Sequence, residues 1–132
     1  MTVFVPTRLV NALNRREHWA TRAARARTQR RAVWAAIWKT TGRDEVVSRA
    51  PKRITMHAHV WRLMDSDGLS AALKACRDGL MDARVIDDDG PASGHVFDPP
   101  TQEVNRRQLG VRITVEPLPG PRPAARREGE GT

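Results

Sequence analysis

Seven aspartates lie within residues 62–90 of a chain that is strongly basic elsewhere. Asp65 and Asp67 stand two positions apart, and an unbroken run of three, Asp87–Asp89, follows further along. Hard divalent cations such as Mg2+ bind carboxylate oxygens and keep several waters for a substrate phosphate. Two carboxylate groups brought together from separate segments are what a metal-dependent phosphodiesterase needs, so these residues are candidate ligands for Mg2+ or Mn2+.

A lysine and a further aspartate follow at helical spacing. Asp67, Lys74 and Asp78 are separated by seven and four residues, which places them on one face of a helix. A lysine beside carboxylates can stabilise the charge that develops on a transferred phosphoryl group. Simpler roles fit the same spacing, because Asp67 can cap the helix and the other two can form a surface ion pair. The aspartate run can likewise be a solvated turn.

A strand and a helix must position these groups. The segment RITMHAHVW at residues 53–61 alternates apolar and other side chains, which predicts a strand that leads directly to Asp65. A helix is predicted from about Leu69 to Ala83, with an apolar stripe at i, i+4, i+7, i+11 and i+14. Its members are Leu69, Leu73, Cys76, Leu80 and Ala83. We expect a short turn after this helix to return the aspartate run toward the end of the strand.

The remaining elements complete one small domain. A strand is predicted at 2–5, a long helix at 19–39, and two extended runs around 107–110 that we interpret as a terminal hairpin. The order β-α-β-α-β-β predicts an α+β domain over residues 1–116, with a mixed sheet packed against two main helices. Residues 117–132 carry Pro, Gly and charge without apolar periodicity, and are predicted to be a disordered tail.

The central stretch resembles the RusA family of Holliday-junction resolvases, which are small phage-associated crossover-junction endodeoxyribonucleases. That family carries Asp-x-Asp-Asn-Leu, a lysine, Asp-(Gly/Ala)-Leu and a closing Asp-Asp pair. The corresponding pieces here are DSDGL, the lysine of LKAC, DGL and IDDD. The likeness extends to NRREHW near the start and covers most of residues 1–116, although only the central motif is specific.

The resemblance implies roles for individual residues. The implied catalytic set, in which carboxylates hold one or two ions and a lysine positions the phosphate, is Asp65, Asp67, Lys74 and Asp89. Asp88 is implied as a neighbouring or alternate metal ligand, and Asp78 as a supporting helix aspartate. Which member of the aspartate run serves as the third carboxylate stays open. The resemblance also implies a homodimer, because a four-way junction has two-fold symmetry and an isologous dimer presents two sites to opposed strands.

Two departures from the family motif matter. Gly68 stands where the family usually has Asn, and six residues separate Asp67 from Lys74, more than in the shortest members. Three extra residues are nearly one helical turn, so the lysine keeps its facing. Neither departure removes a metal ligand. We therefore expect a Mg2+-dependent endonuclease that resolves four-way junctions by paired nicks. The alternatives are a nuclease for flaps or other branched DNA, and a basic DNA-binding protein without cleavage activity.

The overall charge favours a nucleic-acid partner. The chain has 23 Lys+Arg against 15 Asp+Glu and a formal charge of +8, so a polyanion is the expected partner and an anionic membrane surface the weaker alternative. Arginines accumulate at helical spacing before residue 32, although like charges repel there unless a partner such as phosphate neutralises them. The predicted DNA-contacting residues are Asn14, Arg15, Arg16, Arg22, Arg25, Arg27, Arg30 and Arg31. Few aromatic residues accompany them, which favours contacts to the DNA backbone.

The remaining candidate groups receive simpler interpretations. The single cysteine, Cys76, excludes an intrachain disulfide, fits a reducing compartment and is predicted to be a buried core residue. Without an apolar run of spanning length or an export signal, the protein is expected to be cytoplasmic. His57 and His59 share one face of the predicted strand and could bind a metal, but surface or packing roles are favoured. The four tryptophans are predicted to make core or dimer contacts.

Overall fold

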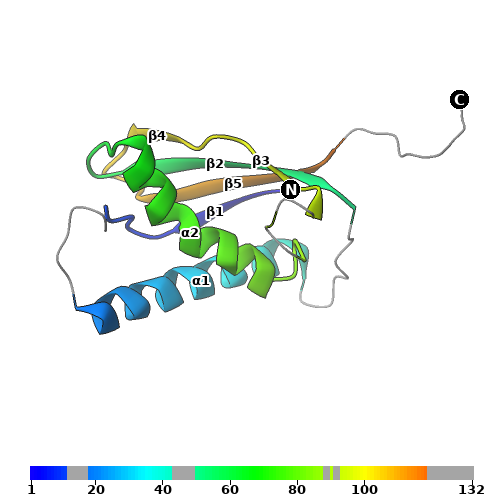
Figure 1. Cartoon of the computed structure of the whole chain (residues 1–132), viewed down its shortest axis with the longest axis horizontal. Coiled ribbons are helices and arrows are strands. Elements are labelled where there is room, and N and C mark those ends of the chain that lie inside the picture. The colour runs from blue at the N-terminus through cyan, green and yellow to red at the C-terminus, as the bar shows by residue number, and fades with distance from the viewer. Residues whose placement is uncertain (12–17, 43–49, 88–89, 91–92, 119–132) are drawn as a thin grey trace, which may run out of the picture.

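The computed structural model describes residues 1–11, 18–42, 50–87, 90 and 93–118, and the account below is confined to them. Along the chain the elements are β1 (Thr2–Pro6), α1 (Trp19–Thr41), β2 (Lys52–Val60), α2 (Ser66–Asp82), β3 (Val96–Phe97), β4 (Thr101–Val104) and β5 (Gly110–Pro117). They form a small α+β domain with two helices and a five-stranded mixed sheet, which confirms the predicted fold class (Figure 1).

β2 lies at the centre of the sheet. It pairs antiparallel with β5, which in turn pairs antiparallel with β1. On its other side β2 pairs in parallel with β3 and then with β4. The predicted terminal hairpin is therefore wrong, because β2 separates β4 from β5. The reason is the crossover through α2, which returns the chain parallel to β2 on one side of that strand before β5 pairs with its other side.

β3 and β4 behave as one edge strand with a break in its middle. Arg53 and Ile54 pair with β3, and the segment His57–Val60 pairs with β4. The break contains Pro99 and Pro100, which have no backbone N–H to donate to β2. Proline is tolerated at a sheet edge, because one side of an edge strand has no neighbouring strand to receive its N–H groups. Proline also prevents this edge from pairing with another chain.

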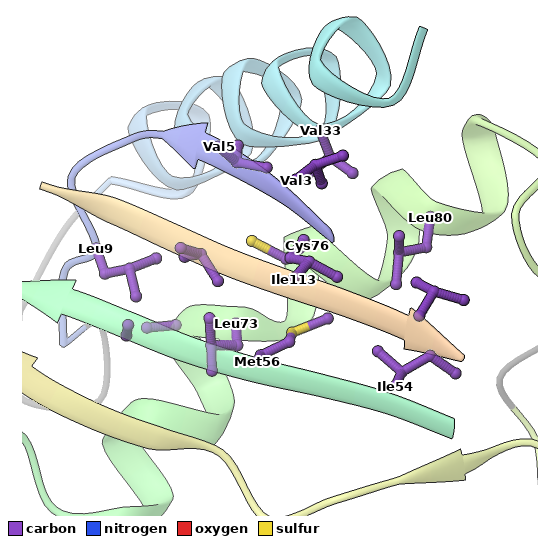
Figure 2. Close-up of a cluster of buried hydrophobic side chains, with 14 of the residues drawn as sticks. Val3, Val5, Leu9, Val33, Ile54, Met56, Leu73, Cys76, Leu80 and Ile113 are labelled. Atoms are coloured by element: carbon purple, nitrogen blue, oxygen red, sulfur yellow. The ribbon is translucent and has the colours of Figure 1, made fainter. Parts of the chain in front are cut away.

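Both helices cover one face of the sheet, which we call the inner face. The inner side chains of β2 are buried as its alternation predicts, and the opposite side chains form the outer face. The predicted apolar stripe of α2 is confirmed, since Leu69, Leu73, Cys76 and Leu80 are buried and Ala83 is partly buried against them. Figure 2 shows Leu73 and Cys76 of α2 beside Met56 of β2 and Ile113 of β5.

The two helices approach each other closely at Gly79. A Cβ at this position would lie 2.7 Å from Cβ of Val33 and 3.1 Å from the carbonyl oxygen of Arg30. Glycine is therefore needed for the close approach of α1 to α2. At the rim of this contact, Arg30 donates two hydrogen bonds of 2.8 Å to the carboxylate of Asp82. This bidentate ion pair fixes the two helices at their exposed edge.

α1 buries less of its surface than the sequence predicts. Val33 and Ile37 enter the core, but Trp19 is 73% exposed. Trp34 and Trp38 stack edge-to-face on the outside of the helix, with ring centroids 4.5 Å apart. The prediction that these three tryptophans lie in the core is therefore wrong. The narrow inner stripe of α1 contains smaller side chains instead. In the described parts of the chain, neither helix combines the length and apolar character needed to cross a membrane.

Candidate functional site

The first pair of aspartates lies at the N-terminus of α2. Asp65 is the N-cap, and its carboxylate accepts a 2.8 Å hydrogen bond from the backbone N–H of Gly68. Asp67 lies in the first turn, where the positive end of the helix dipole favours a carboxylate. The capping role considered for Asp67 is therefore performed by Asp65. Both side chains are exposed, which leaves their remaining oxygens open to solvent and to a cation.

The side-chain amide of Asn11 lies beside this cap, and we call the group of Asp65, Asp67 and Asn11 the acidic corner. An added Cβ at Gly68 would lie 2.6 Å from Oδ1 of Asp65 and 2.7 Å from Nδ2 of Asn11. The Asn11 side chain thus occupies the space that a side chain at residue 68 would need. Its Oδ1 is buried and has no hydrogen-bond partner among the described residues. A buried hydrogen-bond acceptor without a partner costs free energy. An amide oxygen of this kind can also be a ligand for a hard cation.

Lys74 and Asp78 continue the same face of α2. Lys74 lies seven residues beyond Asp67, a rise of about 10 Å along the helix axis. Its Nζ is 3.7 Å from Oδ1 of Asp78, so the predicted i, i+4 pair is present. Lys74 also lines a pocket of about 340 Å³ between α2 and the β3 edge, together with Arg77, whose guanidinium stacks 4.2 Å above the ring of Phe97. Two cationic side chains therefore face this pocket.

The aspartate after α2 lies at the opposite end of the sheet. Asp87 accepts a 3.0 Å hydrogen bond from Nε2 of His95, and Nδ1 of the same histidine accepts from the backbone N–H of Lys52, the first residue of β2. Asp65 instead follows the last residue of β2 (Figure 1). The 17 residues of α2 separate these positions by about 25 Å. The expected return of Asp87 toward Asp65 is therefore wrong.

Asp88 and Asp89, the predicted closing pair, lie outside the described residues. Asn14, Arg15 and Arg16 of the predicted DNA-contacting group lie outside them as well.

An aromatic–arginine cluster stands at the end of β2, next to the acidic corner. Trp61 is 45% exposed, and the guanidinium groups of Arg8 and Arg106 lie 5.5 and 4.7 Å from its ring. Arg106 also donates a 3.0 Å hydrogen bond from Nε to the carbonyl oxygen of Trp61. Two hydrogen bonds between the backbone of Met64 and the Gln102 amide fix the connection that leads on to α2. The cluster offers cations and an aromatic face that suit a nucleic-acid strand.

The arginines of α1 are divided in their contacts. Arg22, Arg27 and Arg31 are exposed and form no ion pair with any described residue. Arg25 is half-buried. The guanidinium of Arg30 is instead committed to Asp82, and this hydrogen-bonded pair raises the pKa of Arg30 and lowers that of Asp82. The basic face predicted from the sequence is therefore retained in part.

Some relevant residues could not be found by sequence reasoning. Asn11 was missed because its contact with Gly68 joins segments far apart in the chain. Glu103 was missed because β4 pairs with β2 rather than with β5, which brings it beside His57 and His59. The contact of Arg106 with Trp61 joins residues 45 apart in the chain, and no local pattern predicts it.

No protein-family model matches this chain, and the search of curated proteins gave no significant match. Functional assignment therefore depends on the motif in α2 and on the chemistry around it.

Proposed function

We propose that the protein is a Mg2+-dependent endonuclease that resolves four-way DNA junctions by paired symmetric nicks, acting as a homodimer. The observation that supports this most is the acidic corner at the start of α2, where Asp65 and Asp67 carry exposed carboxylates and the amide of Asn11 lies against Gly68. The proposal combines this corner with the motif resemblance and the positive charge of the chain.

The donor set fits a hard cation. Mg2+ requires oxygen ligands, and one or two carboxylates with retained waters are its usual protein ligands. Asp65 and Asp67 would hold it, with Asn11 as a third oxygen donor. When bound, the ion would supply Lewis-acid stabilisation and a water of lowered pKa for attack on a phosphodiester. The proposed donor set does not include Asp88 and Asp89, because they follow Asp87 directly in the chain and Asp87 lies at the opposite end of the sheet.

The other residues of the face have separate tasks. Asp65 keeps the first turn of α2 in place through Gly68, which orients the corner. Lys74 would pair with a non-bridging oxygen of the scissile phosphate, and Asp78 holds its ammonium on the correct face of the helix. The long flexible lysine side chain, 73% exposed, can reach back toward the helix start without a change in the backbone.

Two basic surfaces suit the flanking DNA. The cluster of Trp61, Arg8 and Arg106 adjoins the corner and would contact the strand being cut. The exposed arginines of α1 would contact phosphates of an adjoining arm of the junction, with an affinity that falls steeply as salt rises.

The test is cleavage of a labelled synthetic four-way junction and a matched linear duplex, in Mg2+ and in EDTA. Wild type would be compared with Asp67→Asn and with a control at an exposed carboxylate far from the corner, Glu116→Gln. The expected result is symmetric nicking of the junction that is lost in EDTA and in Asp67→Asn but retained in the control. Cleavage that survives Asp67→Asn would overturn the assignment of this residue.

A second function is favoured by two observations, the capping role of Asp65 and the distance of Asp87 from it. In that case the protein is a DNA-binding protein whose aspartates stabilise the helix start. Tight junction binding without cleavage in Mg2+ or Mn2+ would support it. A flap substrate added to the same assay distinguishes a junction resolvase from a nuclease for other branched DNA.

A further inference from the structure

Two histidines and a glutamate converge on the outer face of the sheet, away from the helices. His57 and His59 are neighbours on the outer side of β2, and Glu103 faces them from β4. Oε1 of Glu103 lies 2.7 Å from Nε2 of His57 and 3.6 Å from Nε2 of His59. One donor atom from each of the three side chains lies within 4.8 Å of the others. The parallel register of β2 and β4 is what creates this group.

His59 uses one ring nitrogen for a hydrogen bond to the backbone, which leaves the other for the group. Its Nδ1 is 3.0 Å from the carbonyl oxygen of Gln108, which only accepts, so Nδ1 carries the proton. The amide of Asn105 is 3.5 Å from the same nitrogen, at the outer limit of a hydrogen bond, and does not change this assignment. Nε2 of His59 is buried and has no hydrogen-bond partner among the described residues. The residue is 3% exposed, covered in part by the ring of Phe4.

His57 has the complementary arrangement. Its Nδ1 is 2.6 Å from the hydroxyl oxygen of Thr101, which can accept its proton. Nε2 of His57 donates a hydrogen bond to the carboxylate of Glu103, and this hydrogen bond is the main cause of the lowered pKa of that carboxyl. In both histidines, Nδ1 therefore lies within hydrogen-bond distance of an oxygen atom. This is the usual way in which proteins orient a metal-binding imidazole.

We propose that His57, His59 and Glu103 form a binding site for a divalent transition metal, with Zn2+ the ion that fits best. Two imidazole nitrogens and one carboxylate oxygen are a known three-ligand set for Zn2+, whose fourth position takes water or another ligand. Mg2+ is disfavoured at this site, because it prefers oxygen ligands. This site lies on the opposite face of the sheet from the α2 corner and is separate from the proposed nuclease chemistry.

Two of the three donor separations can be compared with those of a tetrahedral Zn2+ site. Zn–N and Zn–O bonds of about 2.0–2.1 Å in a tetrahedron place donor atoms about 3.3 Å apart. The separation of 3.6 Å between His59 and Glu103 is already close to this value. The hydrogen bond of 2.7 Å between His57 and Glu103 must open by about half an ångström as the metal replaces the shared proton. Glu103 is 51% exposed, so its side chain can move to accommodate the ion.

The test is direct metal binding to the untagged full-length protein. Co2+ would be added as a spectroscopic probe and displaced with Zn2+, in the presence of excess Mg2+. We expect one equivalent of Co2+ with the visible absorption of a low-coordinate site. In long-range 15N spectra, Zn2+ should shift Nε2 of two of the four histidines. His57→Gln and Glu103→Gln, both at solvent-accessible positions, should each weaken metal binding by at least about 30-fold. The loss of a residue that only supports a ligand already weakens binding by about 10–100-fold.

His18→Asn is the matched control, since this exposed histidine caps α1 and asparagine also caps well. It should leave metal affinity unchanged. Thr101→Val should weaken binding about 10-fold by releasing the His57 ring, while the fold is retained. The proposal is overturned if Co2+ and Zn2+ fail to bind stoichiometrically, or if binding is unaffected by both His57→Gln and Glu103→Gln. Because none of these readouts uses DNA, the result is independent of whether the protein is a nuclease.

Discussion

Substitution of Asp65 by asparagine and by alanine distinguishes between two roles of this residue, a helix cap and a metal ligand. The carboxylate of Asp65 accepts the backbone N–H of Gly68 at 2.8 Å and so caps α2. Asparagine caps a helix about as well as aspartate, because its amide oxygen accepts the same hydrogen bond. Alanine has no acceptor and leaves the buried N–H of Gly68 unpaired.

The stability changes can be estimated from this geometry. Replacing an N-cap aspartate by alanine costs about 1 kcal/mol, within a range of about 0.5–2. For a domain of this size, that corresponds to a decrease in Tm of about 3–6 °C. Asp65→Asn keeps the hydrogen bond and loses only the interaction of the charge with the helix dipole, about 0.3–1 kcal/mol. Thermal unfolding of the three proteins should therefore rank wild type, Asp65→Asn and Asp65→Ala in decreasing order.

Junction cleavage should rank them differently. Both variants remove the anionic ligand, so both should lose at least about 100-fold in cleavage rate in Mg2+, measured well below the Tm of either. The reasoning is refuted if Asp65→Asn cleaves within a few-fold of wild type while Asp65→Ala is destabilised. Asp65 would then be a helix cap alone, and the proposed cation site would lose one of its two described carboxylates.

Three further predictions concern packing and titration. Gly68→Asn, which introduces the residue typical of the RusA family motif, should destabilise the fold by about 1–3 kcal/mol, because its Cβ would lie 2.6 Å from Oδ1 of Asp65 and 2.7 Å from Nδ2 of Asn11. Adding Asn11→Ala relieves the second of these contacts and should recover part of that loss in Tm, and no recovery would contradict the packing account. Asp82→Asn should cost less than about 1 kcal/mol at pH 7, since its ion pair with Arg30 is substantially exposed. Because this pair lowers the pKa of Asp82, its contribution is present above the unfolded-state value of about 4 and is lost as pH falls through the folded value. Urea unfolding of wild type and variant should therefore converge at acid pH, and a constant difference would refute the linkage. Burial raises the pKa of the Cys76 thiol to about 12, so a thiol reagent should modify it only as fast as the protein unfolds, whereas rapid labelling in native buffer would disprove its burial.

Local periodicity was sufficient to predict the elements but not their partners. The alternation in β2 and the apolar stripe of α2 are properties of neighbouring residues, and both were confirmed. α2 begins at Ser66 rather than near Leu69, because the cap at Asp65 recruits polar residues into the first turn. The pairing of β4 with β2 depends on which edge the chain reaches after α2, which no local pattern contains.

The candidate site shows the same division. The face shared by Asp67, Lys74 and Asp78 follows from helical spacing alone, and the Lys74–Asp78 contact is present. The position predicted for Asp87 is wrong because α2 is about as long as β2. The 17 residues of the helix therefore carry the chain back to the start of the strand. Helix length could have corrected this. The Asn11 contact and the His57–Glu103 contact join residues more than 40 apart and could not be derived.

The pairing of β1 with β5 has a consequence for the order in which the domain can form during synthesis. Thr2 pairs with Thr114, and Pro6 with Gly110, so Thr2 leaves the ribosome 112 residues before its partner. β2 likewise reaches its antiparallel neighbour only when β5 emerges. Before then α1 and α2 can pack together, but the sheet lacks the strand that joins its two sides. A nascent chain halted before Gly110 should therefore remain sensitive to protease, because loop closure over this distance must precede the cooperative fold.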